Sequence, residues 1–151
     1  MISPETLRRY ALFAGIEPAK FKDIAMISEE VQCDEGCWIF RESDDASALY
    51  IIQSGEVDLK LILDEASEKT VDITKLGEGS VIGWSSLIEP CAYTLNAVAA
   101  SPVKLVKIDA DGLLEMMESD TNLGFSLMKQ LSQALGERLT NLRVQFVSFI
   151  D

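Results

Sequence analysis

The sequence predicts a mainly β fold with flanking helices: a jelly-roll-like antiparallel β-roll of about eight strands, with N-terminal helices and a long C-terminal helix. Between residues 31 and 109, short apolar runs recur about every ten residues, separated by Gly, Pro or acidic turns. From 121 to 150 the apolar residues instead repeat every three or four positions. We therefore expect one domain over 1–151, with N-terminal helices in 1–30, the roll in 31–109 and C-terminal helices in 110–151.

The N-terminal segment carries the start signals of two short helices. Ser3 is a suitable N-cap, and Pro4 follows at the first helical position, where a missing N–H is tolerated. A second helix is expected over 18–28, with Phe21 and Ile24 on its inward side.

The strands follow from alternation and from the turns between them. The turn at 34–36 joins two apolar runs and predicts a hairpin-like unit, and Ser54-Gly55 separates the next two runs. Residues 57–61 alternate apolar and charged, which predicts one buried and one solvated face. A polar turn at 65–68 and a last strand over 103–108 complete the roll.

The long C-terminal helix carries a narrow apolar stripe with near-heptad spacing. A helix of this length outruns one small roll, so we expect the stripe to pair with a second copy of the chain in a homodimer. Packing within the same chain is the alternative. The candidate interface residues are Met128, Leu131, Leu135, Leu139, Leu142, Phe146 and Phe149.

Composition and charge narrow the function classes. With 25 acidic and 13 basic side chains the net charge is −12, which opposes contact with phosphates, so we expect no direct nucleic-acid partner. The chain has no histidine, the commonest general base and metal ligand, so we expect neither an enzyme nor a metal site. No apolar run is long enough for a membrane helix and no secretory signal is evident, so we expect a cytoplasmic protein without a membrane partner.

The cysteines are Cys33, Cys37 and Cys91, an odd count that predicts reduced thiols in a chain without a signal peptide. The spacing of Cys33 and Cys37 would suit a metal or a redox pair, but no second pair and no histidine complete such a site. We interpret them as ordinary thiols flanking a turn, with a redox sensor as the alternative.

Five stretches follow one another in the order "LFAGIEPAKFKDIA", "LYIIQSGEVDLKL", "LGEGSVIGWSSLIEP", "AVAASPVKLVKID" and "LMKQLSQALGERLTNL". This order resembles the cyclic-nucleotide-binding domain of the catabolite-activator-like transcription regulators and of cyclic-nucleotide-regulated kinases and channels. The resemblance covers nearly the whole chain. It implies a sensor in which the roll and the long helix close over a ligand, and in which the position of the helix carries the signal to an output domain.

The resemblance also implies a phosphate-binding cassette over 83–94, in which two charged positions depart from the family. In the family a glutamate follows the first glycine and holds the ribose hydroxyl, and a later arginine pairs with the cyclic phosphate. Here Trp84 takes the glutamate position, and the arginine position falls on Cys91 or, with a shift of one residue, on Ala92. Because the phosphate would lose a charge-assisted pair, we expect cyclic AMP and cyclic GMP to bind weakly or not at all.

Gly83 matches the family, Ser85, Ser86 and Leu87 match it in type, and Thr94 corresponds to its later hydroxyl residue. Trp84 and Tyr93 predict an aromatic pocket. Such a pocket suits a neutral or flat effector held by stacking and hydroxyl groups, or is simply filled by its rings. The candidate ligand-binding residues are Gly83, Trp84, Ser85, Ser86, Leu87, Cys91, Ala92, Tyr93 and Thr94.

We interpret the chain as a regulatory sensor module without a cofactor, in which a small effector or a partner biases the roll against the long helix. A DNA-reading helix-turn-helix would need roughly 60 further residues, so we expect either that the output lies in a separate protein or that the chain is a dimeric binding module by itself. The alternative is a ligand-free dimerising scaffold. A cavity plugged by Trp84 and Tyr93 would favour the scaffold, whereas an open cavity lined by Ser85, Ser86 and Thr94 would favour the sensor.

Overall fold

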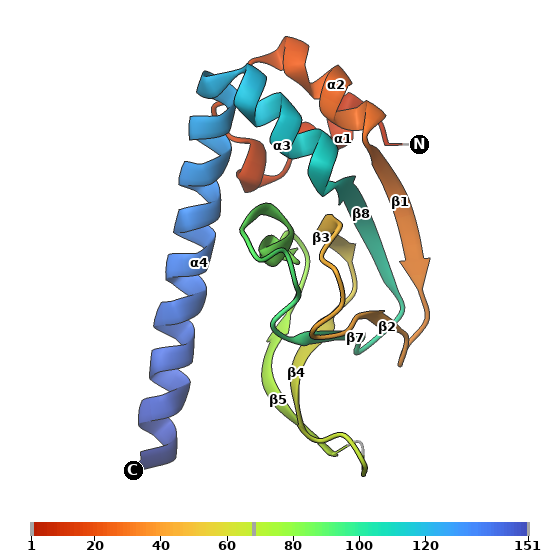
Figure 1. The fold of residues 1–151 in the computed structure, drawn as a ribbon, viewed down its shortest axis with the longest axis vertical. Helices are drawn as coiled ribbons and strands as arrows, with labels where there is room; N and C mark the ends of the chain where they lie inside the picture. The colour runs from red at the N-terminus through yellow and green to blue at the C-terminus, as the bar shows by residue number, and fades with distance from the viewer. Residues whose placement is uncertain (1, 68, 151) are drawn as a thin grey trace.

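The computed structural model describes residues 2–67 and 69–150 and has two four-stranded antiparallel sheets (Figure 1). One sheet has the order β1-β8-β3-β6 and the other β2-β7-β4-β5. Helices stand at both ends of the chain, so the predicted antiparallel roll with flanking helices is confirmed. The strands are β1 (Ser28–Cys33), β2 (Trp38–Phe40), β3 (Ala48–Ser54), β4 (Val57–Asp64), β5 (Lys69–Leu76), β6 (Val81–Ile82), β7 (Asn96–Ala99) and β8 (Val103–Asp109).

The N-terminal helices form where the start signals predict them, but they are short. Ser3 caps α1 (Pro4–Arg8) by accepting a hydrogen bond from the Thr6 amide. The 3₁₀ helices η1 (Ala11–Phe13) and η2 (Pro18–Lys20) follow, and α2 (Phe21–Met26) buries Phe21 and Ile24 as expected. The first strand begins at Ser28, a few residues before the expected start at 31.

The expected hairpin at 34–36 is wrong, because its two strands lie in different sheets. Strand β1 pairs with β8, whereas β2 pairs with β7, so the turn carries the chain from one sheet to the other. The same turn corrects the expectation of reduced thiols. Cys33 and Cys37 form a disulfide, with Cα atoms 5.8 Å apart, a separation that suits such a bridge. Cys91 remains a free thiol.

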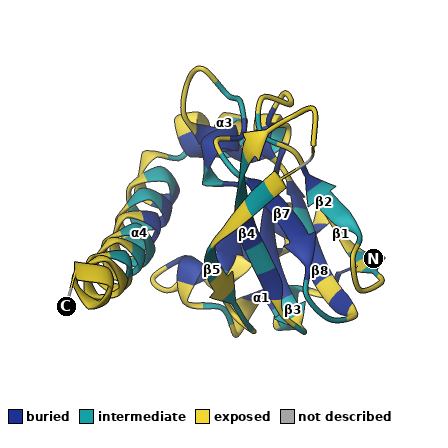
Figure 2. Cartoon of the chain, turned by 90° about the horizontal axis from the view of Figure 1, so that it is seen from below, coloured by how far each residue is buried: buried dark blue, intermediate teal, exposed yellow. Residues whose placement is uncertain are grey.

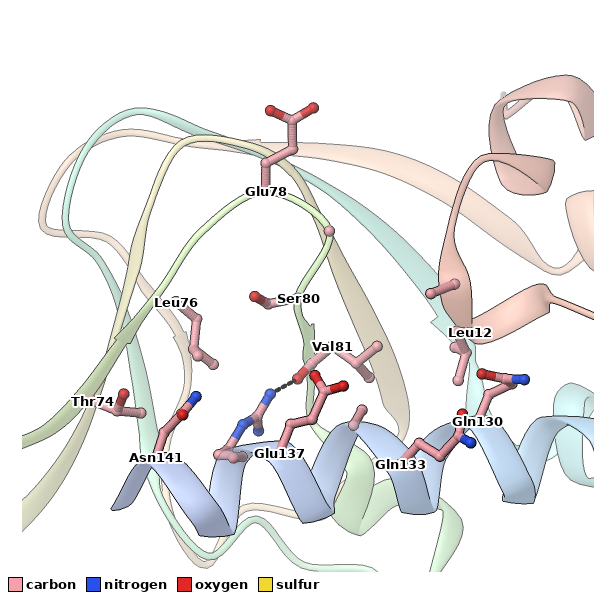
Figure 3. A pocket seen from close by; sticks show the side chains of 14 residues that line it. Leu12, Thr74, Leu76, Glu78, Ser80, Val81, Gln130, Gln133, Glu137 and Asn141 are labelled. Atoms are coloured by element: carbon pink, nitrogen blue, oxygen red, sulfur yellow. Dashed lines mark hydrogen bonds between the residues drawn. The ribbon is translucent and has the colours of Figure 1, made fainter. Parts of the chain in front are cut away.

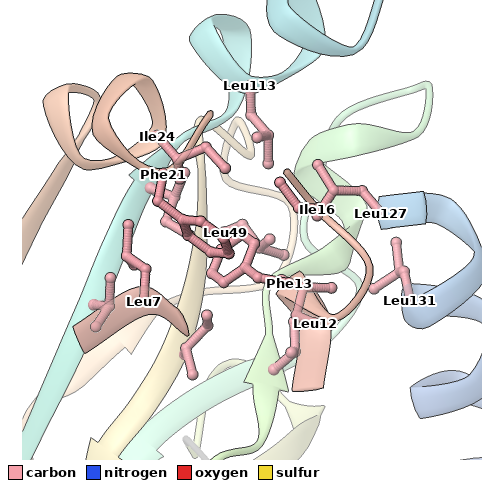
Figure 4. Packing of buried hydrophobic residues seen from close by; sticks show 14 of the residues in the cluster. Leu7, Leu12, Phe13, Ile16, Phe21, Ile24, Leu49, Leu113, Leu127 and Leu131 are labelled. Atoms are coloured by element: carbon pink, nitrogen blue, oxygen red, sulfur yellow. The ribbon is translucent and has the colours of Figure 1, made fainter. Parts of the chain in front are cut away.

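Strand β3 lies between the helices and the second sheet and contributes side chains to both apolar cores. Its residues from Ala48 to Ile52 are all buried, because helices cover one face of the strand and the second sheet covers the other. Leu49 (Figure 4) and Ile51 belong to the core on the helical side, while Tyr50 and Ile52 belong to the core between the two sheets. The molecule therefore has two apolar cores, one on each side of β3.

The C-terminal helices are α3 (Ala110–Ser119) and α4 (Thr121–Ile150), which have the bounds that the sequence predicts. Asp109 caps α3 by accepting a hydrogen bond from the Gly112 amide. Helix α4 begins beside α3 and then runs along the roll as a long arm (Figure 1). Its buried residues, Leu123, Leu127 and Leu131, all lie in the first half, and the end of the helix is exposed (Figure 2).

Candidate functional site

The cassette starts at Gly83, where β6 ends and the 3₁₀ helix η3 (Trp84–Leu87) begins. Gly83 has φ +80°, a region that favours glycine. A Cβ at this position would also lie 3.0 Å from the Ala48 carbonyl oxygen, which is closer than most real contacts. The turn into η3 therefore requires a residue without a side chain.

The two serines of the cassette are buried and face the protein. The Ser86 hydroxyl donates to the Gly83 carbonyl oxygen at 2.7 Å, and the Ser86 amide bonds the same oxygen. Leu87 and the half-buried Trp84 pack into the core beneath the helices. The Ser86 hydroxyl is thus used to hold η3 in place.

Aromatic rings fill the interior of the roll next to the cassette. Tyr93 stacks on Phe40 with ring centroids 3.9 Å apart, and its hydroxyl donates to the Ala48 carbonyl oxygen at 2.9 Å. Burial raises the pKa of this hydroxyl, so it remains a neutral donor. The cavity that remains has about 20 Å³, which holds roughly one water molecule.

This small cavity sorts the predicted site residues into two groups. Gly83, Trp84, Ser85, Tyr93 and Thr94 line it. The remaining four predicted residues, Ser86, Leu87, Cys91 and Ala92, are not among its lining residues. A cation at position 93, rather than at 91 or 92, would therefore face the cavity.

Sequence reasoning missed a cation, Arg138, which reaches the cassette from α4. Its guanidinium donates to the carbonyl oxygen of Val81, and the residue also lines the small cavity. Burial lowers the pKa of this arginine because desolvation disfavours its charge. The helical register could have indicated it, since Arg138 follows Leu127, Leu131 and Ala134 on one face of α4 at spacings of four, three and four.

Asn96 is a second residue that the sequence did not single out. It is fully buried at the start of β7, and its side-chain oxygen accepts a bond from the Glu42 amide at 2.8 Å. Its side-chain nitrogen donates to the Lys60 carbonyl oxygen at 3.1 Å. Asn96 therefore ties the segment after the cassette to strand β4 and to the turn that follows β2.

The sequence profile of the family described as "Cyclic nucleotide-binding domain" matches residues 30–120. The chain belongs to the cyclic nucleotide-binding domain family. A CRP-like cAMP-activated global transcriptional regulator of Mycobacterium tuberculosis is 26% identical over 147 residues, 97% of this chain and 64% of the regulator. A cGMP-dependent protein kinase, egl-4, of Caenorhabditis briggsae is 23% identical over 74% of this chain and 15% of the kinase. The chain thus spans less than two thirds of these relatives.

Solved structures of this family also match the fold. A protein of Geobacter metallireducens assigned as a cyclic nucleotide-binding protein has 38% identity and a TM-score of 0.82, over 92% of this chain and 99% of that protein. A cyclic nucleotide-binding domain of Methylobacillus flagellatus has 21% identity and a TM-score of 0.79, over 95% and 80% of the two chains. The domain described here is therefore a regulatory module of the cyclic nucleotide-binding type.

The predicted interface residues of this cyclic nucleotide-binding domain fall into two groups along α4, a buried group followed by a mostly exposed one. Leu131 is only 3% exposed and belongs to the core of its own chain, which corrects its assignment to a dimer interface. Met128 and Leu135 are partly buried against the same core. Leu142 is half-buried, whereas Leu139, Phe146 and Phe149 are exposed by 50%, 65% and 86%.

Two further observations concern metals and membranes. Within residues 2–67 and 69–150, no group of three or more Cys, Asp or Glu side chains is arranged to hold a metal ion. None of the helices in this described part of the domain is long and apolar enough to cross a bilayer.

Proposed function

We propose that this domain is a regulatory sensor module that dimerises through α4 and couples its cassette to that helix through Arg138. The observation that carries the proposal is the position of Arg138, whose guanidinium bonds the Val81 carbonyl oxygen next to Gly83. A ligand or partner that changes the cassette would change this contact and with it the position of α4. The proposal needs no metal and no cofactor.

Cyclic AMP and cyclic GMP should bind this module weakly, although cyclic nucleotides define the family. A small-molecule pocket usually has about 300 Å³ or more, whereas the cavity beside the cassette has about 20 Å³ because Tyr93 and Phe40 fill the roll. Trp84 also stands at the position where the family has the glutamate that holds the ribose hydroxyl of the nucleotide. Calorimetry with each nucleotide on the full chain should give dissociation constants no better than high micromolar. Submicromolar binding of either one would contradict the proposal.

The exposed part of α4 supports a homodimer. Leu139, Phe146 and Phe149 form an apolar stripe on a helix that outruns the roll, and exposed apolar area of this kind is typical of interfaces. A second copy would cover the stripe by pairing the two helices side by side. Sedimentation at tens of micromolar protein is the direct measurement.

Direct nucleic-acid binding is not part of this proposal. The net charge of −12 opposes the phosphate contacts that supply most nonspecific affinity. A gel shift of duplex DNA at low micromolar protein and physiological salt should show no complex. A salt-dependent complex with a slope of several phosphate contacts would overturn this part of the proposal.

The ligand-free scaffold remains a second candidate, and the filled roll favours it. A thermal-shift screen of nucleotides and small metabolites separates the two functions. A ligand at 100 times its dissociation constant adds about 2.7 kcal/mol to the free energy of unfolding, which is an easily measured shift. A dimer that responds to no compound would be a scaffold.

A further inference from the structure

A groove of about 420 Å³ lies outside the roll, between α4 and the turn that joins β5 to β6 (Figure 3). Gln130, Gln133 and Asn141 of α4 line one wall, and Thr74 and Ser80 line the wall opposite. The volume is within the range of about 300–1,000 Å³ that small-molecule sites occupy. The space that the roll interior lacks is therefore present on its outer side.

Arg138 is the positively charged residue of the α4 wall, and the same side chain lines the small cavity of the roll. Its guanidinium has one hydrogen bond in the structure, to the Val81 carbonyl oxygen, out of five N–H donors. None of the carboxylates in residues 2–67 and 69–150 forms an ion pair with it. A half-buried guanidinium without an anionic partner has free donors for a carboxylate, which it binds in a two-pronged geometry.

Glu137 precedes Arg138 by one residue and sets the charge of the ligand that the groove accepts. It lines the groove and is exposed, and Figure 3 shows it pointing toward the β6 side. Glu78 also lines the groove, but Figure 3 shows its carboxylate pointing away from α4. A ligand with several negative charges would be repelled by Glu137 and by the acidic surface, whereas an ammonium group would be attracted.

The amide side chains of the groove complete the chemistry. Gln130, Gln133 and Asn141 each offer a donor and an acceptor, and the Ser80 and Thr74 hydroxyls do the same. We propose that the groove binds a small zwitterion of the amino-acid class, with its carboxylate on Arg138, its ammonium on Glu137 and its side chain among the amides. This site shares only Arg138 with the cassette cavity and does not depend on cyclic nucleotide binding.

The shared arginine has a consequence for signalling. A carboxylate that takes two of the free N–H groups reorients the guanidinium, which also holds the Val81 carbonyl oxygen. Occupancy of the groove therefore alters the contact that joins α4 to the cassette, and the ligand is sensed at the helix without entering the roll.

Calorimetry on the full chain tests the ligand class directly. The probes are the standard amino acids, and for each one that binds, the amine lacking the carboxylate and the acid lacking the ammonium. At least one amino acid should bind saturably, and both truncated compounds should bind about tenfold more weakly or worse, because each lacks one charged contact. The proposal is overturned if no amino acid binds at millimolar concentration, or if the acid alone binds equally well.

Substitutions then place the ligand in the groove. Arg138→Met removes the guanidinium, and Asn141→Asp adds an anion to an exposed position of the groove wall without threatening the fold. Each should weaken binding about tenfold to a hundredfold. Asn122→Asp, the same change on the exposed first turn of α4 and outside the groove, is the matched control and should leave affinity unchanged. If Asn141→Asp binds as tightly as Asn122→Asp, the site is not in the groove.

Discussion

Helix α4 carries two apolar stripes, and they differ in what covers them. The inner stripe, defined by Leu123, Leu127 and Leu131, is at most 4% exposed and packs beneath the other helices. The outer stripe, defined by Leu139, Phe146 and Phe149, is at least 50% exposed. Both have helical spacing, so periodicity alone does not separate them.

The difference in burial shows how much of α4 packs on the apolar core of its own chain. The inner stripe ends where the helix passes the edge of the core, and the next inward residues, Arg138 and Gln145, make hydrogen bonds to strand carbonyl oxygens instead of apolar contacts. Beyond Leu135 the helix is therefore attached to the roll by polar contacts, and its apolar residues Leu139, Phe146 and Phe149 are exposed. A second copy would bury that side, whereas the inner stripe serves the fold of one chain.

The largest expected effect comes from charging the outer stripe. Leu139→Lys combined with Phe146→Lys should convert a dimer into monomers that keep their secondary structure. Each buried side chain is worth about 1.5–3 kcal/mol and counts twice in a symmetric dimer, so the loss is roughly 6 kcal/mol or more, or about four orders of magnitude in dissociation constant. Sedimentation and circular dichroism measure the two outcomes.

The matched control adds the same charges outside the stripe. Thr140→Lys with Ser148→Lys places two lysines on exposed positions of α4 that the outer stripe does not use. This variant should sediment like the wild type. A wild-type protein that is already monomeric at tens of micromolar would show that the outer stripe has no partner copy.

The inner stripe should affect the free energy of unfolding of a single chain. In the monomeric Leu139→Lys, Phe146→Lys background, Leu127→Ala should lower that free energy by about 2–5 kcal/mol because it leaves a cavity in the core. Phe149→Ala in the same background should change it by less than about 0.5 kcal/mol. Urea unfolding gives both values. Equal losses in the two variants would show that both stripes contribute equally to the fold of one chain.

Most of the fold could be predicted because it depends on local patterns. The cap at Ser3, the bounds of α4 and the last strand each follow from residues next to one another in the sequence. The error at 34–36 has a different origin. A tight turn between two strands has the same sequence pattern whether the strands pair with each other or belong to separate sheets. The Cys33–Cys37 disulfide was missed because redox state was judged from the count of cysteines and not from their proximity across that turn.

The candidate site was only partly predictable because its parts come from distant segments. The cassette residues lie in one stretch and were found together, but Phe40, which stacks on Tyr93, lies far away in β2. Arg138 arrives from α4, 57 positions after its hydrogen-bond partner Val81. Leu131 was assigned to the wrong stripe because it sits at the boundary between two patterns of the same spacing.

Charging the cassette tests whether its cavity lacks the charged contacts that would hold a cyclic nucleotide. Trp84→Glu combined with Tyr93→Arg restores an acid and places a cation at a position that lines the cavity, and it removes the ring that stacks on Phe40. Cyclic AMP or cyclic GMP should bind about tenfold to a hundredfold more tightly, as one charge-assisted hydrogen bond is worth roughly 1.5–3 kcal/mol. Calorimetry provides the measurement.

Two control variants carry the cation at neighbouring positions. Trp84→Glu with Cys91→Arg, and Trp84→Glu with Ala92→Arg, should gain less because neither position lines the cavity. A larger gain with Arg at 91 or 92 would show that the cassette moves to bring those positions inward on binding.

The smallest expected effect concerns the polar attachment of the outer half of α4. The Gln145 side-chain nitrogen donates to the Ile73 carbonyl oxygen of β5 at 3.1 Å, so it links the end of the helix to the roll. Gln145→Ala should raise amide hydrogen exchange in residues 142–150 about twofold to tenfold, since an exposed hydrogen bond contributes roughly 0.5–1.5 kcal/mol. Ser148→Ala is the control, because the Ser148 hydroxyl bonds only the Gln145 carbonyl oxygen of its own helix. In the monomeric background this end has no partner copy, so the contact with Ile73 is what restrains it. Unchanged exchange there would mean that the outer half of α4 is held by its own helical bonds and not by the roll.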